Sequence, residues 1–158
     1  PVEAVETMHR VCLRVEKRPL LPAGRHEIPS RFGRIDEAVA MATMYTANHL
    51  KIRAVVALTE SGMSPLNMSR VRTAMPIYGL SRFPRSLGKM TLYRGVYPIF
   101  FDVVKFTREE INAAAVDVLL DHELLTQGDL VILTKGDHQG VGGGSNAMKI
   151  LVVGEVVV

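Results

Sequence analysis

The stretch that decides the fold is Ala54-Val-Val-Ala-Leu-Thr-Glu-Ser-Gly-Met-Ser-Pro-Leu-Asn-Met-Ser-Arg70. Its first five residues are apolar and are bounded by polar ones, a pattern typical of a parallel strand that is buried on both faces. A polar turn from Thr59 to Ser64 follows. Ser64 followed by Pro65 predicts a helix start, with serine as the N-cap and proline at the first helical position. We therefore expect a strand, a tight turn and a helix.

This turn has the composition of an anion-binding site. Hydroxyl groups and the unpaired N–H groups of a helix start would face whatever lies over Ser61, Gly62 and Ser64. These donors, together with the helix dipole, favour a phosphate group. The alternative interpretation is an ordinary capped helix with only water at its mouth. The turn alone leaves both interpretations open.

Length and composition are those of one ordinary domain. The chain has 158 residues, an apolar fraction of 47% and a formal net charge of +3, with Lys and Arg scattered along it. This pattern gives little support to nucleic-acid binding. A single cysteine, Cys12, excludes an internal disulfide and a cysteine metal cluster, and it fits a reducing compartment. No apolar run reaches the ~20 residues of a membrane span, and no signal peptide is evident.

Three segments follow one another along the chain. Residues 1–17 predict an amphipathic helix with Cys12 in its apolar face as a small core residue. Residues 18–34 contain three prolines and two glycines without a clear period, and they indicate a connector. The globular domain is expected over 35–158. Because the chain has no initiator Met, we expect it to be a piece of a longer protein.

The rest of the domain alternates helices with strands, which favours a parallel sheet. A glycine-rich loop joins the last two strands, so the final strand should run antiparallel. Thr107 and Glu110 match a capping box at the start of the last helix. The fold class expected is α/β, a three-layer α/β/α sandwich with a mostly parallel five-stranded sheet and an antiparallel edge strand. Besides the strand and helix quoted first, the expected elements are a helix over 36–50, a strand over 75–81, a helix over 84–92, a strand over 95–101, a helix over 107–125, and strands over 130–134 and 148–153.

Three loops should lie beyond the carboxyl ends of the parallel strands, where ligands bind in such sheets. They are Thr59 to Ser64, Ser81 to Pro84 with Arg82 as a fork-shaped phosphate donor, and Lys135 to Asn146 with unobstructed backbone N–H groups. The third loop also offers Ser145, and His138 is a further candidate. The sequence contains no Rossmann or phosphate-loop fingerprint, no Ser/His/Asp set at readable spacing and no paired histidines for a metal.

Several blocks in register resemble the carboxyl-terminal regulatory domain of pyruvate kinase, and the N-terminal segment resembles the last helix of that enzyme's catalytic barrel. The blocks are Pro1-Val-Glu-Ala-Val-Glu-Thr-Met8, Val55-Val-Ala-Leu-Thr-Glu-Ser-Gly62, Pro76-Ile-Tyr-Gly-Leu-Ser-Arg82, Leu92-Tyr-Arg-Gly-Val-Tyr-Pro98, Gly128-Asp-Leu-Val-Ile-Leu-Thr134 and Ser145-Asn146. The amino-acid sequence of these blocks is most similar to that of bacterial forms that respond to sugar monophosphates or AMP.

The resemblance implies a site for a phosphorylated effector. Its phosphate turn would comprise Thr59, Glu60, Ser61, Gly62, Met63 and Ser64, with Arg82 nearby. Its closing loop would comprise Gly136, Gly142, Gly143, Gly144, Ser145 and Asn146. The family often has Lys or Arg where this chain has Met63, and its closing loop usually reads Gly-Ser/Thr-Thr-Asn. The segment over 101–108 is short and lacks the Trp and Arg that bisphosphate-regulated relatives place there. This favours a monophosphate effector, a sugar monophosphate or AMP, or a pocket that is no longer used.

The resemblance also implies what lies elsewhere in the full enzyme. The catalytic residues, with magnesium and potassium, belong to the barrel, so this chain has none of them and should not transfer phosphate from phosphoenolpyruvate to ADP alone. Expected partners are its own barrel domain and further copies of itself, a tetramer in the full cytoplasmic enzyme, without nucleic acid or membrane. One alternative is a purely structural oligomerisation module with a vestigial pocket. Another is a free-standing small-molecule enzyme.

Overall fold

The computed structural model describes residues 1–16, 31–136 and 144–155. The chain divides into two compact units, Pro1–Ser30 and Arg31–Val158. Most of the connector predicted over 18–34 lies outside the described residues. Among these residues, no helix is both long and apolar enough to cross a membrane.

The first unit contains a single described helix, α1 (Val2–Glu16). Its apolar residues are exposed, among them Val5 and Met8. Cys12 is exposed and free, whereas the sequence predicted a core position. An amphipathic helix can bury its apolar stripe only against a second packed element, and the first unit contains no other helix or strand among its described residues.

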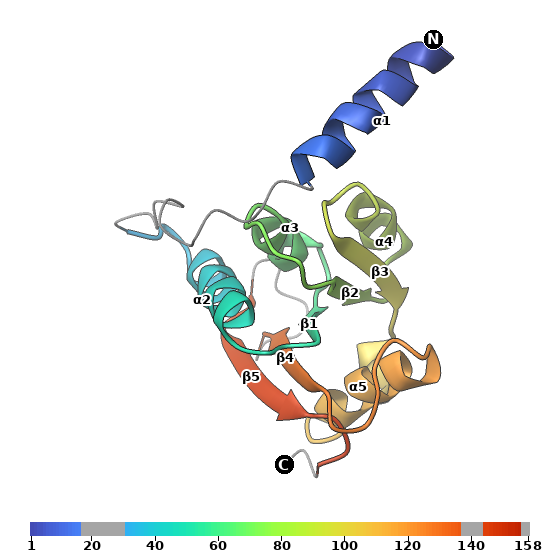
Figure 1. Ribbon diagram of the computed structural model, residues 1–158. Coiled ribbons are helices and arrows are strands. Elements are labelled where there is room, and N and C mark those ends of the chain that lie inside the picture. Colours follow the sequence, from blue (N-terminus) through green and yellow to red (C-terminus); the bar gives the residue numbers. More distant parts are fainter. Residues whose placement is uncertain (17–30, 137–143, 156–158) are drawn as a thin grey trace. The chain divides into compact units, whose positions relative to one another are not determined.

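The second unit alternates strands and helices along the chain (Figure 1). In chain order its elements are α2 (Ile35–His49), β1 (Ala54–Leu58), α3 (Met63–Ser69), β2 (Ile77–Ser81), α4 (Pro84–Met90), β3 (Val96–Phe100), the 3-10 turn η1 (Val103–Lys105), α5 (Ile111–Asp121), β4 (Leu130–Lys135) and β5 (Ala147–Val152). Each predicted strand is present, and β1 has the predicted bounds.

The five strands form one sheet in the order β3-β2-β1-β4-β5. The first four are parallel, and Val55 of β1 lies opposite both Ile77 of β2 and Ile132 of β4. β5 runs antiparallel to β4, with Leu133 opposite Lys149. The predicted mostly parallel sheet with an antiparallel edge strand is therefore confirmed.

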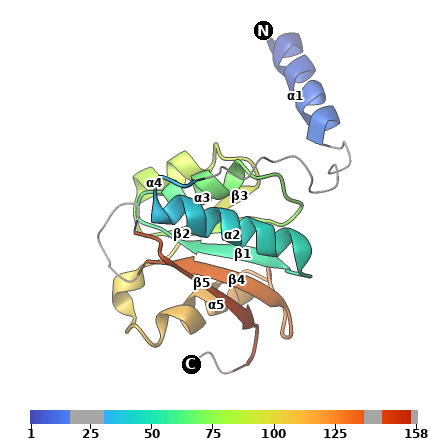
Figure 2. The same ribbon diagram turned by 90° about the vertical axis from the view of Figure 1, so that its left-hand side faces the viewer.

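Helices cover both faces of the sheet (Figure 2). On one face α2, α3 and α4 enclose a core that includes Met68, Met90 and Val55. On the other face α5 contributes Leu119 to a core that includes Val56. Because successive strand residues point to opposite faces, Val55 and Val56 belong to different cores. The three-layer α/β/α architecture predicted from the sequence is confirmed.

Glycine in the middle of β2 allows α4 to pack closely on the sheet. A Cβ atom on Gly79 would lie 2.4 Å from Sδ of Met90 and 3.4 Å from Cγ of Pro65. Met90 is fully buried, so its sulfur occupies the space that a larger residue at position 79 would need. A glycine inside a strand commonly marks such a close approach.

The last helix is shorter than predicted at both ends. The capping-box bonds are made, since Thr107 N donates to Oε2 of Glu110 at 2.9 Å and Glu110 N donates to Oγ1 of Thr107 at 3.4 Å. Regular helix nevertheless begins at Ile111 and ends at Asp121. The end falls before the predicted Leu125 because Glu123 adopts the left-handed conformation, with φ of 57°, which terminates a helix.

Replacing Glu110 with glutamine is expected to remove an acid-sensitive contribution to stability. Hydrogen bonds from Thr107 hold the pKa of Glu110 below its usual value of 4.5. A lowered folded-state pKa stabilises the fold above the unfolded pKa, and this stabilisation is lost as the pH falls through the folded pKa. In urea titrations, Glu110→Gln should therefore be less stable than wild type at pH 7, and the difference should shrink by pH 3. The exposed neighbour Glu109, as Glu109→Gln, is the control; an equal difference at both pH values would contradict the assignment.

Candidate anion-binding site

The turn after β1 lies where the carboxyl ends of the parallel strands meet one edge of the sheet. β1, β2 and β4 end at Leu58, Ser81 and Lys135. The crevice beyond these ends is where parallel α/β sheets bind ligands. The Thr59–Ser64 turn, Arg82 and the stem of the β4–β5 loop all follow strands that end there, as the sequence predicted.

Gly62, and not Ser64, is the N-cap of α3. Its φ of 80° lies in the left-handed region, which glycine adopts at little cost. The chain thereby enters the helix at Met63, and Pro65 becomes the third helical residue, where its missing N–H still costs no intrahelical bond. The predicted Ser64 cap was wrong because the glycine turns the chain into the helix earlier.

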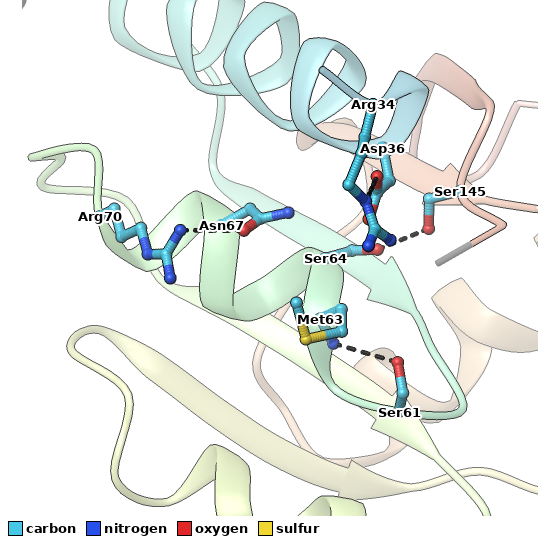
Figure 3. A network of polar contacts seen from close by, with 8 residues as sticks. All are labelled: Arg34, Asp36, Ser61, Met63, Ser64, Asn67, Arg70 and Ser145. Carbon is cyan, nitrogen blue, oxygen red and sulfur yellow. Dashed lines mark hydrogen bonds and ion pairs between the residues drawn. The ribbon is translucent and has the colours of Figure 1, made fainter. Parts of the chain in front are cut away.

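The backbone donors of the turn are engaged by its own hydroxyl groups. Gly62 N donates to Oγ1 of Thr59 at 2.9 Å. Met63 N donates to Oγ of Ser61 at 3.4 Å, the bond drawn in Figure 3. The second distance is long for an N–H···O bond. An anion that binds these two N–H groups would have to replace a hydrogen bond of ordinary length at Gly62 and a long, weak hydrogen bond at Met63.

Apolar side chains close one side of the turn. A Cβ atom on Gly62 would lie 3.3 Å from Cγ of Met90 and 3.8 Å from Cε2 of Tyr93. Glycine is therefore required at this position both by its backbone conformation and by these neighbours. Met90 therefore presents no N–H or O–H group to a ligand on this side of the turn.

Ser64 joins the turn to the loop between β4 and β5. Its Oγ lies 2.6 Å from Oγ of Ser145, and both serines are buried. The loop stem is also close-packed at its base, since a Cβ atom on Gly136 would lie 2.3 Å from the carbonyl oxygen of Gly144. Two residues predicted in separate segments, Ser64 and Ser145, are thus in direct contact.

The rest of the predicted closing loop is only partly described. Asn146 N donates to the carbonyl of Lys135 at 3.2 Å, which continues the β4–β5 ladder. Gly142, Gly143 and the candidate His138 lie outside the described residues.

Arg82 is paired with another residue of the predicted site. Its Nη2 lies 3.4 Å from Oε1 of Glu60, and its guanidinium stacks over the ring of Phe83 with Cζ 4.7 Å from the centroid. The Glu60 backbone carbonyl accepts a bond from Oγ of Ser86. Arg82 is thus paired with Glu60, while its Nε is buried and has no hydrogen-bond partner among the described residues. The role of Arg82 as a phosphate donor stays a prediction.

Sequence reasoning missed Arg34 and Asp36, which lie at the start of α2. Arg34 Nε and Nη2 donate to Oδ1 and Oδ2 of Asp36 at 2.8 and 2.9 Å. The bonds and the charge of Asp36 raise the pKa of Arg34. Figure 3 shows this pair on the side of Ser64 and Ser145. An acidic residue in a first helical turn ordinarily indicates only a dipole interaction, so the local sequence held no signal for this arrangement.

Comparison with known proteins gives concordant matches. The family model described as pyruvate kinase, alpha/beta domain, matches residues 37–151. Pyruvate kinase II of Salmonella typhimurium is 42% identical over 156 residues, which cover 97% of this chain and 32% of that protein. The pyruvate kinase of Haemophilus influenzae is 43% identical over 155 residues, with the same coverage of both chains. That of Geobacillus stearothermophilus is 32% identical over 161 residues, or 27% of its length. The chain thus spans about a third of the length of these relatives.

Proposed function

The chain belongs to the pyruvate kinase family, whose alpha/beta domain it matches over residues 37–151, and we propose from this premise that it binds a phosphorylated effector and forms a subunit contact in such an enzyme. The observation that carries the proposal is the Ser64–Ser145 contact of 2.6 Å. It brings the turn after β1 and the β4–β5 loop together at the edge of the sheet where ligands of parallel α/β folds bind.

The effector class that fits best is a phosphate monoester, either a sugar monophosphate or AMP. The site offers the hydroxyls of Ser61, Ser64 and Ser145 and the weakly engaged Met63 N–H. Arg82 is already paired with Glu60, so little positive charge is available for a second phosphate group. Hydrogen bonds to a charged acceptor are the stronger kind, and one phosphate group can accept several of them.

The reaction of the whole enzyme, phosphoryl transfer between phosphoenolpyruvate and ADP, is assigned to a catalytic domain that this chain would regulate. Within residues 1–16, 31–136 and 144–155, no three His, Cys, Asp or Glu side chains are grouped to hold a metal ion. A cytoplasmic location is proposed from the free thiol of Cys12, which fits a reducing compartment.

The effector site is tested by calorimetric titration of the 158-residue chain with ribose 5-phosphate, glucose 6-phosphate and AMP. At least one should bind, and its unphosphorylated counterpart should not. Ser64→Ala should weaken binding about tenfold or more, because a hydrogen bond to a charged group contributes roughly 1.5–3 kcal/mol. The control is Ser69→Ala in the same helix, whose hydroxyl donates to the Leu66 carbonyl. If none of the three compounds binds wild type, the effector role is refuted.

A second candidate is a purely structural oligomerisation module. The observation that favours it is the edge strand β5. Among the described residues β5 pairs with β4 alone, and its Met148 and Ile150 are 37% and 43% exposed. Open strand edges pair readily with another chain. Self-association in sedimentation velocity, combined with no binding of any of the three phosphates, would favour this module over the effector-binding domain.

A further inference from the structure

Arg34 keeps part of its hydrogen-bonding capacity unused. Its guanidinium carries five N–H donors, and two of them are directed at Asp36. Within the parts of the chain that the structure describes, no other acceptor is bonded to this guanidinium. The side chain is 51% exposed, whereas that of Asp36 is 1% exposed. The buried carboxylate thus fixes the cation in one orientation and leaves its outer donors accessible.

This orientation directs Arg34 toward the contact between Ser64 and Ser145. α2 packs against α3, and Figure 3 shows the Arg34 guanidinium pointing toward the two serine hydroxyls. A guanidinium that is held by one carboxylate loses little further conformational freedom when it binds an anion.

A side-chain amide group is a third kind of donor near Arg34, besides the guanidinium and the serine hydroxyls. Nδ2 of Asn67 is buried and has no hydrogen-bond partner among the described residues. Figure 3 shows this nitrogen on the side of α3 that faces Arg34 and Asp36. A buried donor without an acceptor is costly. Together with the N–H groups of Arg34 that Asp36 does not bind, this nitrogen is a donor that the hydrogen bonds of the cluster leave unused.

We propose that Arg34, held by Asp36, supplies the positive charge for the phosphate group of the effector, which lies between Arg34 and the hydroxyls of Ser64 and Ser145. This inference rests on the proposed function and adds the residue that selects a phosphorylated ligand. It places the phosphate beside Ser64, on the side of α3 where Arg34 lies (Figure 3); Met90 and Tyr93 pack next to Gly62. Arg82 is paired with Glu60 just as Arg34 is paired with Asp36, so the choice between the two arginines rests on direction: the Arg34 guanidinium points toward Ser64 and Ser145 (Figure 3).

A purely structural role for the pair makes a different prediction. If Arg34 and Asp36 only fasten the start of α2, their removal changes stability and leaves the affinity of the folded protein unaltered. The double variant Arg34→Gln/Asp36→Asn removes both charges while it keeps the side-chain shapes and avoids an unpaired buried carboxylate. The matched control is Arg53→Gln/Asp129→Asn, the same change in an ion pair of 3.9 Å at the amino end of β1 and β4.

The experiment is calorimetric titration of the folded 158-residue chain and both double variants with ribose 5-phosphate, glucose 6-phosphate and AMP. For every ester that binds wild type, Arg34→Gln/Asp36→Asn should lower the affinity tenfold or more, and the control variant should change it less than twofold. A measurement on wild type alone is independent of how the variant folds: the side-chain Nε–H signal of Arg34 in a ¹⁵N spectrum should shift on saturation with the ester, and that of Arg53 should not.

The possible results separate this assignment from the proposed function. If an ester binds wild type and the Arg34→Gln/Asp36→Asn variant equally, or leaves the Arg34 signal unmoved, the assignment of Arg34 is overturned while the effector site stands. An equal loss in both double variants overturns it as well, since the effect would then be general. If no ester binds wild type, the effector site and the role of Arg34 are refuted together.

Discussion

Replacing Met90 with alanine is expected to lower the free energy of unfolding by about 2–5 kcal/mol, the range for truncating a fully buried methionine. Met90 is 0% exposed and belongs to the core between the sheet and α2–α4. Its sulfur occupies the space over Gly79 and its Cγ lies near Gly62. The cavity left by alanine would therefore border both β2 and the turn of the candidate site.

Urea unfolding at pH 7 measures this loss. Leu92→Ala is the control, because Leu92 lies two residues further on and is 85% exposed, and its effect should stay within about 0.5 kcal/mol. Met90→Leu conserves volume and should cost less than about 1.5 kcal/mol. A loss below 1 kcal/mol for Met90→Ala, as for ordinary surface changes, would contradict the packing described over Gly79.

Gly136→Val should have the second largest effect, a loss of about 1–3 kcal/mol from overpacking. Even a Cβ atom at this position would lie 2.3 Å from the carbonyl oxygen and 2.8 Å from the carbonyl carbon of Gly144. Both are backbone atoms, so the strain is relieved only by separating the two sides of the loop stem. Ser145 would move with Gly144, and its contact with Ser64 would be broken.

Two measurements follow from this reasoning. Gly136→Val should lower the urea midpoint, and it should also weaken the phosphate ester that binds wild type. The control is Gly88→Ala in α4, where a Cβ atom meets nothing within 4 Å. Since alanine is the better helix former by about 0.5–1 kcal/mol, Gly88→Ala should be neutral or stabilising. Unchanged stability of Gly136→Val would show that the loop stem is looser than described.

The strands could be predicted from the sequence because their signals are local. β1 is an apolar run between polar residues, and its bounds were predicted to the residue. Helix ends were less predictable, because they depend on single backbone conformations. The αL conformation of Gly62 overrode the Ser64-Pro65 signal, and the positive φ of Glu123 ended α5 early, although glutamate gives no indication of such a turn.

The residues of the candidate site also differ in how well the sequence predicts them. Ser64 and Ser145 were both identified from loop composition, since each follows a strand that ends at one edge of the sheet. Their direct contact depends on the β4–β5 register, which the sequence does not specify. Arg34 and Asp36 were missed because they precede the first strand of the domain and meet α3 only through the packing of α2. Arg82 was identified, but its pairing with Glu60 needed the arrangement of two different turns.

The central place of β1 in the sheet has a consequence for how the domain is made. Ala54 pairs with Val131, so one flank of β1 stays open until almost the whole domain has left the ribosome. The pairing with β2 closes a much shorter loop and costs less chain entropy. Pairing of β1 with β4 joins residues that are far apart in the sequence, and such distant parallel pairing slows folding. An unpaired apolar strand edge is also where incompletely folded chains aggregate.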